Sequence, residues 1–217
     1  SASIVHIVFN QYFNGYSELC YKRSTDGGTS WSADTWLTNN GAGTAFSPSV
    51  AVNGALVQVA WCDSHEGNFE IYHKRSTDSG ANWGAVTRLT NTSTTSYMPT
   101  IAVAASTVQI VWQEYVNSKW KLNHIRSTDG GISWGTIFQL TNSTGNSALS
   151  NLAVSASSVH LVWSDDRNGN NEIYYKCSTN SGISWGTDSR LTIDTNGSLN
   201  PSVAVSGSVV NVVWRDT

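Results

Sequence analysis

Charged residues, helix-forming stretches and long apolar runs are all scarce in this sequence of 217 residues. Charged residues account for 12% of it, Met occurs once, and no segment is dominated by Ala, Leu, Glu and Lys. This composition argues against a helical bundle, and no apolar run approaches the roughly 20 residues that a membrane-spanning helix needs. The net charge of −3 gives no electrostatic reason to expect nucleic acid or an anionic membrane as a partner. Abundant Ser, Thr, Asn and Gly favour strands and turns instead.

Cysteine is sparse as well. Cys20, Cys62 and Cys177 show no motif spacing and occupy three different positions of the repeat described below. We expect them to be free buried thiols, and we expect neither a metal site nor a cofactor. No secretory signal peptide is recognisable, and the chain starts in the middle of the repeat, so one expectation is that its true N-terminus is missing.

One octapeptide recurs four times, and its copies start 52, 51 and 51 residues apart. Its conserved positions are Ser24, Asp26, Gly28 and Trp31; Ser76, Asp78, Gly80 and Trp83; Ser127, Asp129, Gly131 and Trp134; and Ser178, Asn180, Gly182 and Trp185. Ser and Asp side chains can accept backbone N–H bonds within a tight loop, and Gly tolerates the positive φ that such a loop requires. The octapeptide therefore predicts a turn, with the Trp packing it against a neighbour.

The residues between the octapeptides predict strands. A first strand is expected at residues 48–52, 99–103, 151–154 and 201–205. A second strand alternates apolar residues and ends in an aromatic one, at residues 5–9, 57–61, 108–112, 159–163 and 210–214. A third strand, such as 70–75, leads into the octapeptide, and a fourth, such as 87–90, follows it.

The Ser-x-Asp-x-Gly-x-x-Trp octapeptide at this spacing resembles the Asp-box, or BNR, repeat of sialidases and related propellers, across essentially the whole chain. The resemblance implies an all-β fold, a β-propeller of four-stranded antiparallel blades joined by Asp-box turns. We expect a single domain over residues 1–217, with blade repeats at about 3–38, 48–90, 99–141 and 150–192 and a partial blade at 200–216.

The expected strands number 17, one more than four blades need. The 200–206 strand could complete the 3–31 hairpin and close a four-bladed ring. Alternatively the chain is an arc of a larger ring, or two chains complete one ring together. An open arc would expose edge strands and favour association, so a homo-oligomer is a possible state.

The resemblance implies that ligands bind at the face opposite the Asp boxes, which carries the loops after the second and fourth strands. Two residues after each second-strand aromatic lie Gln11, Asp63, Glu114, Asp165 and Asp216. These side chains could form an acidic ring near a channel mouth, or simply initiate hairpin turns. An oxygen-rich loop at 165–172 lacks the spacing of an EF-hand, so we predict no calcium site there.

Departures from the repeat carry more information about a ligand. Trp120 stands where the other repeats have Ser17, Phe69 and Asn171. Arg167 and Arg215 are not matched by an Arg at the same position of all the other repeats. Tyr115 falls on the same set of loops. Aromatic rings beside carboxylates and Arg suit a sugar. The apolar face of the sugar stacks on the aromatic rings, and its hydroxyls form hydrogen bonds with the charged groups. The complete set of predicted ligand-binding residues is Asp63, His65, Glu114, Tyr115, Trp120, Asp165, Asp166, Arg167, Arg215 and Asp216.

Sialidase chemistry is only partly supported by these residues. The resemblance implies an Arg triad, a Tyr nucleophile with a Glu partner, an Asp acid/base and an Arg-Ile-Pro motif. The Arg-Ile-Pro motif is absent, and only Arg167 and Arg215 are plausible arginines on the ligand face. Tyr115 follows Glu114 directly, and adjacent side chains on a strand point apart. No catalytic residue is therefore assigned.

The sequence favours a non-catalytic, lectin-like propeller, secreted or displayed on a cell surface, that binds a carbohydrate or a protein. The alternatives are a sialidase-like glycoside hydrolase, or a fragment of one, and a structural or protein-interaction module of a larger surface protein.

Overall fold

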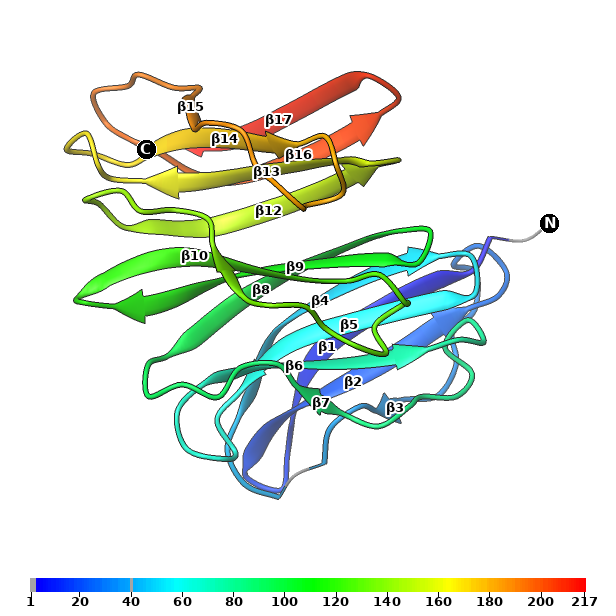
Figure 1. The fold of residues 1–217 in the computed structure, drawn as a ribbon. Coiled ribbons are helices and arrows are strands. Elements are labelled where there is room, and N and C mark those ends of the chain that lie inside the picture. The colour runs from blue at the N-terminus through cyan, green and yellow to red at the C-terminus, as the bar shows by residue number, and fades with distance from the viewer. Residues whose placement is uncertain (1–2, 40) are drawn as a thin grey trace. The chain divides into compact units, whose positions relative to one another are not determined.

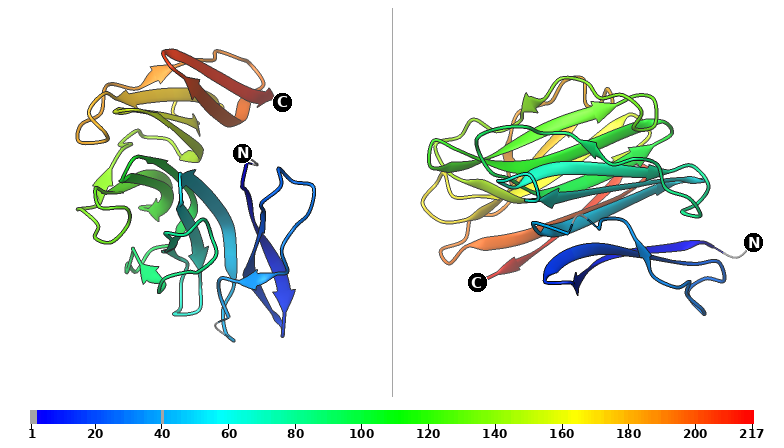
Figure 2. Two further views of the ribbon diagram at one scale, coloured as in Figure 1. Left: turned by 90° about the vertical axis from the view of Figure 1, so that its right-hand side faces the viewer. Right: turned by 90° about the horizontal axis from the view of Figure 1, so that it is seen from below.

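A computed structural model describes residues 3–39 and 41–217. In these residues the chain forms 17 antiparallel strands and no helix, which confirms the predicted all-β class and strand number. The chain divides into two compact units, residues 1–101 and 102–217. The strand order within each sheet can be followed in Figure 1 and, from two further directions, in Figure 2.

The first unit holds two sheets that follow the predicted repeat. The first sheet has the order β1-β2-β3 and the second the order β4-β5-β6-β7. Their strands are β1 (Val5–Phe13), β2 (Tyr16–Ser24), β3 (Thr35–Trp36), β4 (Ala45–Asn53), β5 (Leu56–Asp63), β6 (Glu70–Ser76) and β7 (Thr87–Arg88). Leu19, Tyr21, Leu37, Trp61 and Tyr72 are among the buried residues of the core of this unit.

Strand β8 (Ser96–Ala104) spans the division and belongs to the third sheet, in the order β11-β10-β9-β8. The fourth sheet has the order β12-β13-β14-β15, and the fifth pairs only β16 with β17. The remaining strands are β9 (Thr107–Val116), β10 (Lys119–Ser127), β11 (Phe138–Gln139), β12 (Ser147–Ser155), β13 (Ser158–Asp165), β14 (Glu172–Ser178), β15 (Ser189–Arg190), β16 (Ser198–Ser206) and β17 (Val209–Asp216). Val111, Leu122, Leu161 and Trp163 are among the buried residues of the core of the second unit.

The first strands of the repeat begin earlier than predicted. Strand β4 begins at Ala45, three residues before the predicted start at Pro48, and so includes Phe46. The register of β4 against β5 shifts between Phe46 and Ser49, where Ser47 takes a positive φ of 52°. This bulge lets the strand continue across an irregular pair, which the alternation of apolar residues alone did not reveal.

The octapeptide forms the same closed turn in each copy. In the second copy, the Ser76 hydroxyl donates to Asp78 (2.7 Å) and accepts from the Gly80 N–H (2.9 Å). Asp78 in turn accepts the N–H of Asn82 at 2.8 Å and its side-chain amide at 2.7 Å. Together with the Ser76 hydroxyl, these bonds lower the pKa of Asp78 to about 2. The turn is therefore held by its own side chains.

In two copies of the octapeptide, the glycine has a second role, which is close packing between sheets. A Cβ on Gly80 would lie 1.8 Å from the Tyr21 hydroxyl, and one on Gly182 would lie 2.6 Å from the Gln109 side-chain oxygen. The Trp of the octapeptide packs at the same place, because Trp83 meets Tyr21 edge-on at 4.9 Å between ring centroids. Only a residue without a side chain lets the turn approach the neighbouring sheet this closely.

Histidines on the second and third strands form cross-strand hydrogen bonds. His73 bonds Gln58 at 2.5 Å, and His124 bonds Gln109 at 2.6 Å. Burial, with a smaller contribution from the neighbouring arginine, lowers the pKa of His73 to about 3 and that of His124 to about 4. Both imidazoles are therefore neutral at pH 7.

Candidate functional site

The hairpin ends opposite the octapeptide turns gather the predicted polar and aromatic residues, and in the second unit they do so most densely. Strand β9 reaches this end at Tyr115 and turns through Asn117 and Ser118, which both have positive φ (51° and 61°). A two-residue turn with positive φ at both positions matches the twist of antiparallel strands. Consequently Trp120 pairs directly with Tyr115 across the hairpin.

Tyr115 and Trp120 form an aromatic pair. Their ring centroids are 5.1 Å apart and the rings are tilted by 57°. The Tyr115 side chain is 44% exposed and Trp120 is half-buried. The backbone N–H of Trp120 donates to the Asn146 side-chain oxygen at 3.1 Å, which connects the hairpin to the loop before β12. The pair is thus an aromatic surface on paired strands rather than on a free loop.

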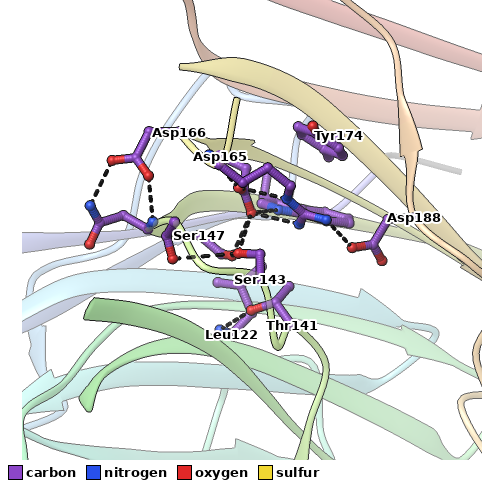
Figure 3. Close-up of polar contacts among 12 residues, drawn as sticks. Leu122, Thr141, Ser143, Ser147, Asp165, Asp166, Tyr174 and Asp188 are labelled. Carbon is purple, nitrogen blue, oxygen red and sulfur yellow. Dashed lines mark hydrogen bonds and ion pairs between the residues drawn. The ribbon is translucent and has the colours of Figure 1, made fainter. Parts of the chain in front are cut away.

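Asp165 lies at the start of the next hairpin and is completely buried. It accepts bonds from the Trp163 indole (3.1 Å), the Ser147 hydroxyl (2.6 Å) and the Arg167 guanidinium (2.8 and 2.7 Å), as Figure 3 shows for Asp165 and Ser147. Burial alone would raise the pKa of Asp165, but the bonds from Arg167, Ser147 and Trp163 together outweigh it and lower the pKa. Asp165 is therefore ionised and faces Arg167, not solvent.

Arg167 is held on three sides. Besides its bidentate bond to Asp165, its NH1 atom lies 2.8 Å from Asp188, and its guanidinium lies 4.2 Å above the centre of the Tyr174 ring. Asp188 also pairs with Lys176 at 2.8 Å, and Figure 3 shows Asp165, Tyr174 and Asp188 around this network. Hydrogen bonds from Arg167 to Asp165 outweigh burial and raise the pKa of Arg167.

Asp166 joins this network to the aromatic pair. Its carboxylate accepts the N–H of Asn146 at 2.6 Å and the side-chain amide of the same residue at 2.7 Å. Asn146 is the residue that bonds the Trp120 backbone. The site is therefore one connected structure, from Tyr115 and Trp120 through Asn146 and Asp166 to Arg167.

Lys121 was missed at the sequence level. It stands where the other repeats have Glu18, Glu70 and Glu172, all buried, so the repeat reverses its charge here. Its ammonium donates to the backbone carbonyls of Ser143 and Gly145 (2.8 Å for Gly145). Burial lowers the pKa of Lys121, against the opposing influence of Asp165. Alignment of the third strands could have revealed this reversal.

Glu114 and Trp112 differ from their repeat partners in a related way. Trp61, Trp163 and Trp214 each donate an indole N–H to the Asp two residues later. Glu114 instead accepts from Asn123, and the buried Trp112 indole N–H has no partner among the described residues. The third sheet thus departs from the repeat at several polar positions of one end.

The other predicted ligand residues do not join this cluster. Asp63 is buried in the first unit, where its carboxylate accepts the Trp61 indole (3.4 Å) and the His65 N–H (3.0 Å). Arg215 and Asp216 are exposed on β17, and Asp216 accepts from Ser198 at 2.8 Å. The described residues contain no group of three or more His, Cys, Asp or Glu side chains placed to hold a metal ion. The ligand-binding role of all these residues stays a prediction.

The structure is similar to several solved glycoside hydrolases. A variant of NanB sialidase from Streptococcus pneumoniae matches with a TM-score of 0.65 at 10% identity, over 92% of this chain and 52% of that one. Trypanosoma rangeli sialidase in complex with the inhibitor DANA matches with a TM-score of 0.63 at 14% identity, over 84% and 36%. An α-L-arabinofuranosidase from Fusarium graminearum matches with a TM-score of 0.64 at 12% identity, over 94% and 63%.

These likenesses show that the all-β fold is similar to that of sialidase β-propellers. The identities are too low to carry more than the fold, and this chain spans between 36% and 63% of those three proteins. No protein-family model and no curated protein matches the sequence. The number of blades and the closure of a ring stay predictions.

Proposed function

We propose that this chain is a non-catalytic recognition propeller that binds carbohydrate at the hairpin ends opposite the octapeptide turns, outside the cell or on its surface. The observation that carries the proposal is the partly exposed aromatic pair Tyr115–Trp120, whose hairpin is bonded to Asn146 and, through it, to Asp166. Aromatic faces stack on the apolar face of a sugar ring, and a pair on paired strands loses little entropy on binding.

A glycan array with the purified, folded chain tests this proposal. We expect specific binding to a defined set of glycans and its loss in Trp120→Ala. Phe138→Ala is the matched control, since Phe138 is 56% exposed on the outer strand of the same sheet and pairs with His124, far along β10 from Trp120. An array without a hit for a folded chain, or loss of binding in the control as well, would count against the proposal.

Glycoside hydrolysis is the second candidate, favoured by the likeness to sialidases and an arabinofuranosidase. Two observations weigh against it. Arg88, Arg167 and Arg190 are each paired with carboxylates of their own sheet. Asp165 is buried and engaged by four side chains and a backbone N–H. Turnover of a fluorogenic sialoside or arabinofuranoside, abolished by Arg167→Ala, would establish this candidate instead.

Assembly through β17 is a third candidate. Trp214 is 43% exposed, whereas Trp61, Trp112 and Trp163 at the same repeat position are buried. Among the residues that the structure describes, β17 is hydrogen-bonded to β16 alone. A strand edge without a partner can pair with a strand of another chain. Light scattering distinguishes the states, because a stable monomer would have a mass of 23.4 kDa and a dimer about twice that. A monomer at high concentration would remove this candidate.

A further inference from the structure

The cations beside the aromatic pair are already engaged by the protein. The side of the Arg167 guanidinium that could grip a carboxylate with two bonds, Nε and NH2, faces the buried Asp165. NH1 faces Asp188. Lys121 points at two backbone carbonyls. An acidic sugar would have to displace a buried carboxylate from Arg167, which would leave Asp165 ionised and without its main partner.

The charges around the site are also balanced. The hairpins and loops of this end carry four carboxylates (Glu114, Asp165, Asp166 and Asp188) and four basic side chains (Lys119, Lys121, Arg167 and Lys176). Among them, Arg167 pairs with Asp165 and Asp188, and Lys176 pairs with Asp188. Lys119, at the tip of the hairpin, is half-buried and supplies only a single point charge. Recognition of a carboxylate normally uses an excess of positive charge and a planar fork of donors. Neither is offered here.

The polar groups that support the aromatic pair suit hydroxyls better than carboxylates. The Asn146 amide oxygen accepts the backbone N–H of Trp120, Asp166 in turn accepts the backbone and side-chain N–H groups of Asn146, and Tyr115 carries its own hydroxyl. Acceptor-rich surroundings favour ligands that donate hydrogen bonds, as sugar hydroxyls do. The exposed ring of Tyr115 beside Trp120 offers the apolar contact.

We infer that this site, if it binds carbohydrate as proposed above, takes a neutral saccharide rather than a sialic or uronic acid. Arg167 then acts as a positioning residue: it organises Asp165, Tyr174 and Asp188 beneath the hairpin and does not bind a ligand carboxylate. The inference separates this chain from the sialidases to which its fold is similar.

Isothermal titration calorimetry of the full chain tests this inference. The neutral probes are cellohexaose, xylohexaose and laminarihexaose, and the acidic probes are sialyllactose and a galacturonic acid hexamer. We expect at least one neutral probe to bind, and its affinity to change less than about twofold between about 50 mM and 500 mM NaCl. Trp120→Ala should weaken it by about tenfold or more, with Phe138→Ala unchanged. Trp120→Phe, which keeps an aromatic ring, should retain binding to within a few fold and guards against misfolding.

The outcomes separate the inference from the proposed function. Binding of sialyllactose or the acidic hexamer, weakened by salt and abolished by Arg167→Ala, would overturn the neutral class while leaving carbohydrate recognition in place. Binding of no saccharide by a chain that melts cooperatively would overturn both. The positioning role is supported if Arg167→Ala and Arg167→Lys lose the same affinity for the neutral saccharide, while the affinity of the wild type does not depend on the NaCl concentration.

Discussion

The hairpins β5–β6 and β13–β14 occupy the same place in the repeat and differ in the basic side chain beside the buried Asp, which is His65 in the first and Arg167 in the second. In the first, Asp63 faces His65, whose ring lies 5.0 Å from Tyr72; in the second, Asp165 faces Arg167 above Tyr174. The frame of a buried Trp, a buried Asp and a Tyr on the next strand is common to both.

The surroundings of His65 and Arg167 differ at one further position. Asp188, which completes the Arg167 network, is replaced by the exposed Val86 in the second sheet. Glu66 instead pairs with Arg88 and lies 3.3 Å from His65. A shared frame of buried residues therefore supports different charge arrangements through a few partly buried substitutions, so the repeat determines the geometry but not the charges beside it.

The largest effect is expected where the repeat approaches a neighbouring sheet. Gly80→Ala should destabilise by about 3–5 kcal/mol, because its Cβ would collide with the rigid Tyr21 ring at a φ of +78°. Gly182→Ala should cost about 2–3 kcal/mol, since the Gln109 side chain can move. Gly15→Ala, with a positive φ but open space, is the control at about 1–2 kcal/mol. Urea denaturation measures all three, and equal costs would refute the packing argument.

Removal of the buried carboxylate should destabilise the protein more in the β13–β14 hairpin than in the β5–β6 hairpin. Asp165→Ala should cost about 3–5 kcal/mol, because Arg167 and the Trp163 and Ser147 donors lose their acceptor. Asp63→Ala removes the acceptor of the Trp61 indole N–H and of the His65 backbone N–H, so about 1–3 kcal/mol is expected. The difference in thermal midpoint between the two variants is the readout, and a larger effect for Asp63→Ala would contradict the comparison.

Acid should destabilise both units through their buried histidines. The unfolded state binds a proton at each His below about pH 6.5, whereas folded His73 and His124 have pKa values lowered to about 3 and about 4. Their contribution is therefore complete above pH 6.5 and is lost as pH falls toward the folded values, by about 3 kcal/mol each at pH 4.

Chemical denaturation at pH 7 and pH 4 checks this sign. His124→Gln should reduce the loss of stability between the two pH values, whatever its effect at pH 7. If the free energy of unfolding falls between pH 7 and pH 4 as much in His124→Gln as in the wild type, other groups are responsible for the loss of stability in acid.

The smallest effect is expected from transferring the Arg167 network to the first unit. His65→Arg combined with Val86→Asp should give the new guanidinium the acceptors Asp63 and the introduced carboxylate, beside Lys74. Because this pair is partly exposed, the gain should be about 0.5–1 kcal/mol. Differential scanning calorimetry against His65→Arg alone measures it, and destabilisation by the double change would show that the two frames are not interchangeable.

Much of the fold could be predicted from particular residues. The apolar alternation ending at Trp61, Trp112 and Trp163 identified the central strands, because a strand buries alternate side chains. Bulges such as that at Ser47 escaped prediction, since any residue can be forced to a positive φ by its neighbours. Trp120 and Arg167 were recognised as departures from the repeat, but their partners Asn146 and Asp188 were not, because these come from distant loops.

The sequence by itself determined the repeat, the turns and the all-β class, because each rests on local hydrogen bonds and alternation within about 50 residues. Only the tertiary structure decided that Asp63 and Asp165 face inward, that Arg167 is neutralised by two carboxylates, and that Gly80 and Gly182 meet a neighbouring sheet. Burial and ion pairing depend on which loops meet in space, and a repeat pattern does not encode those meetings residue by residue.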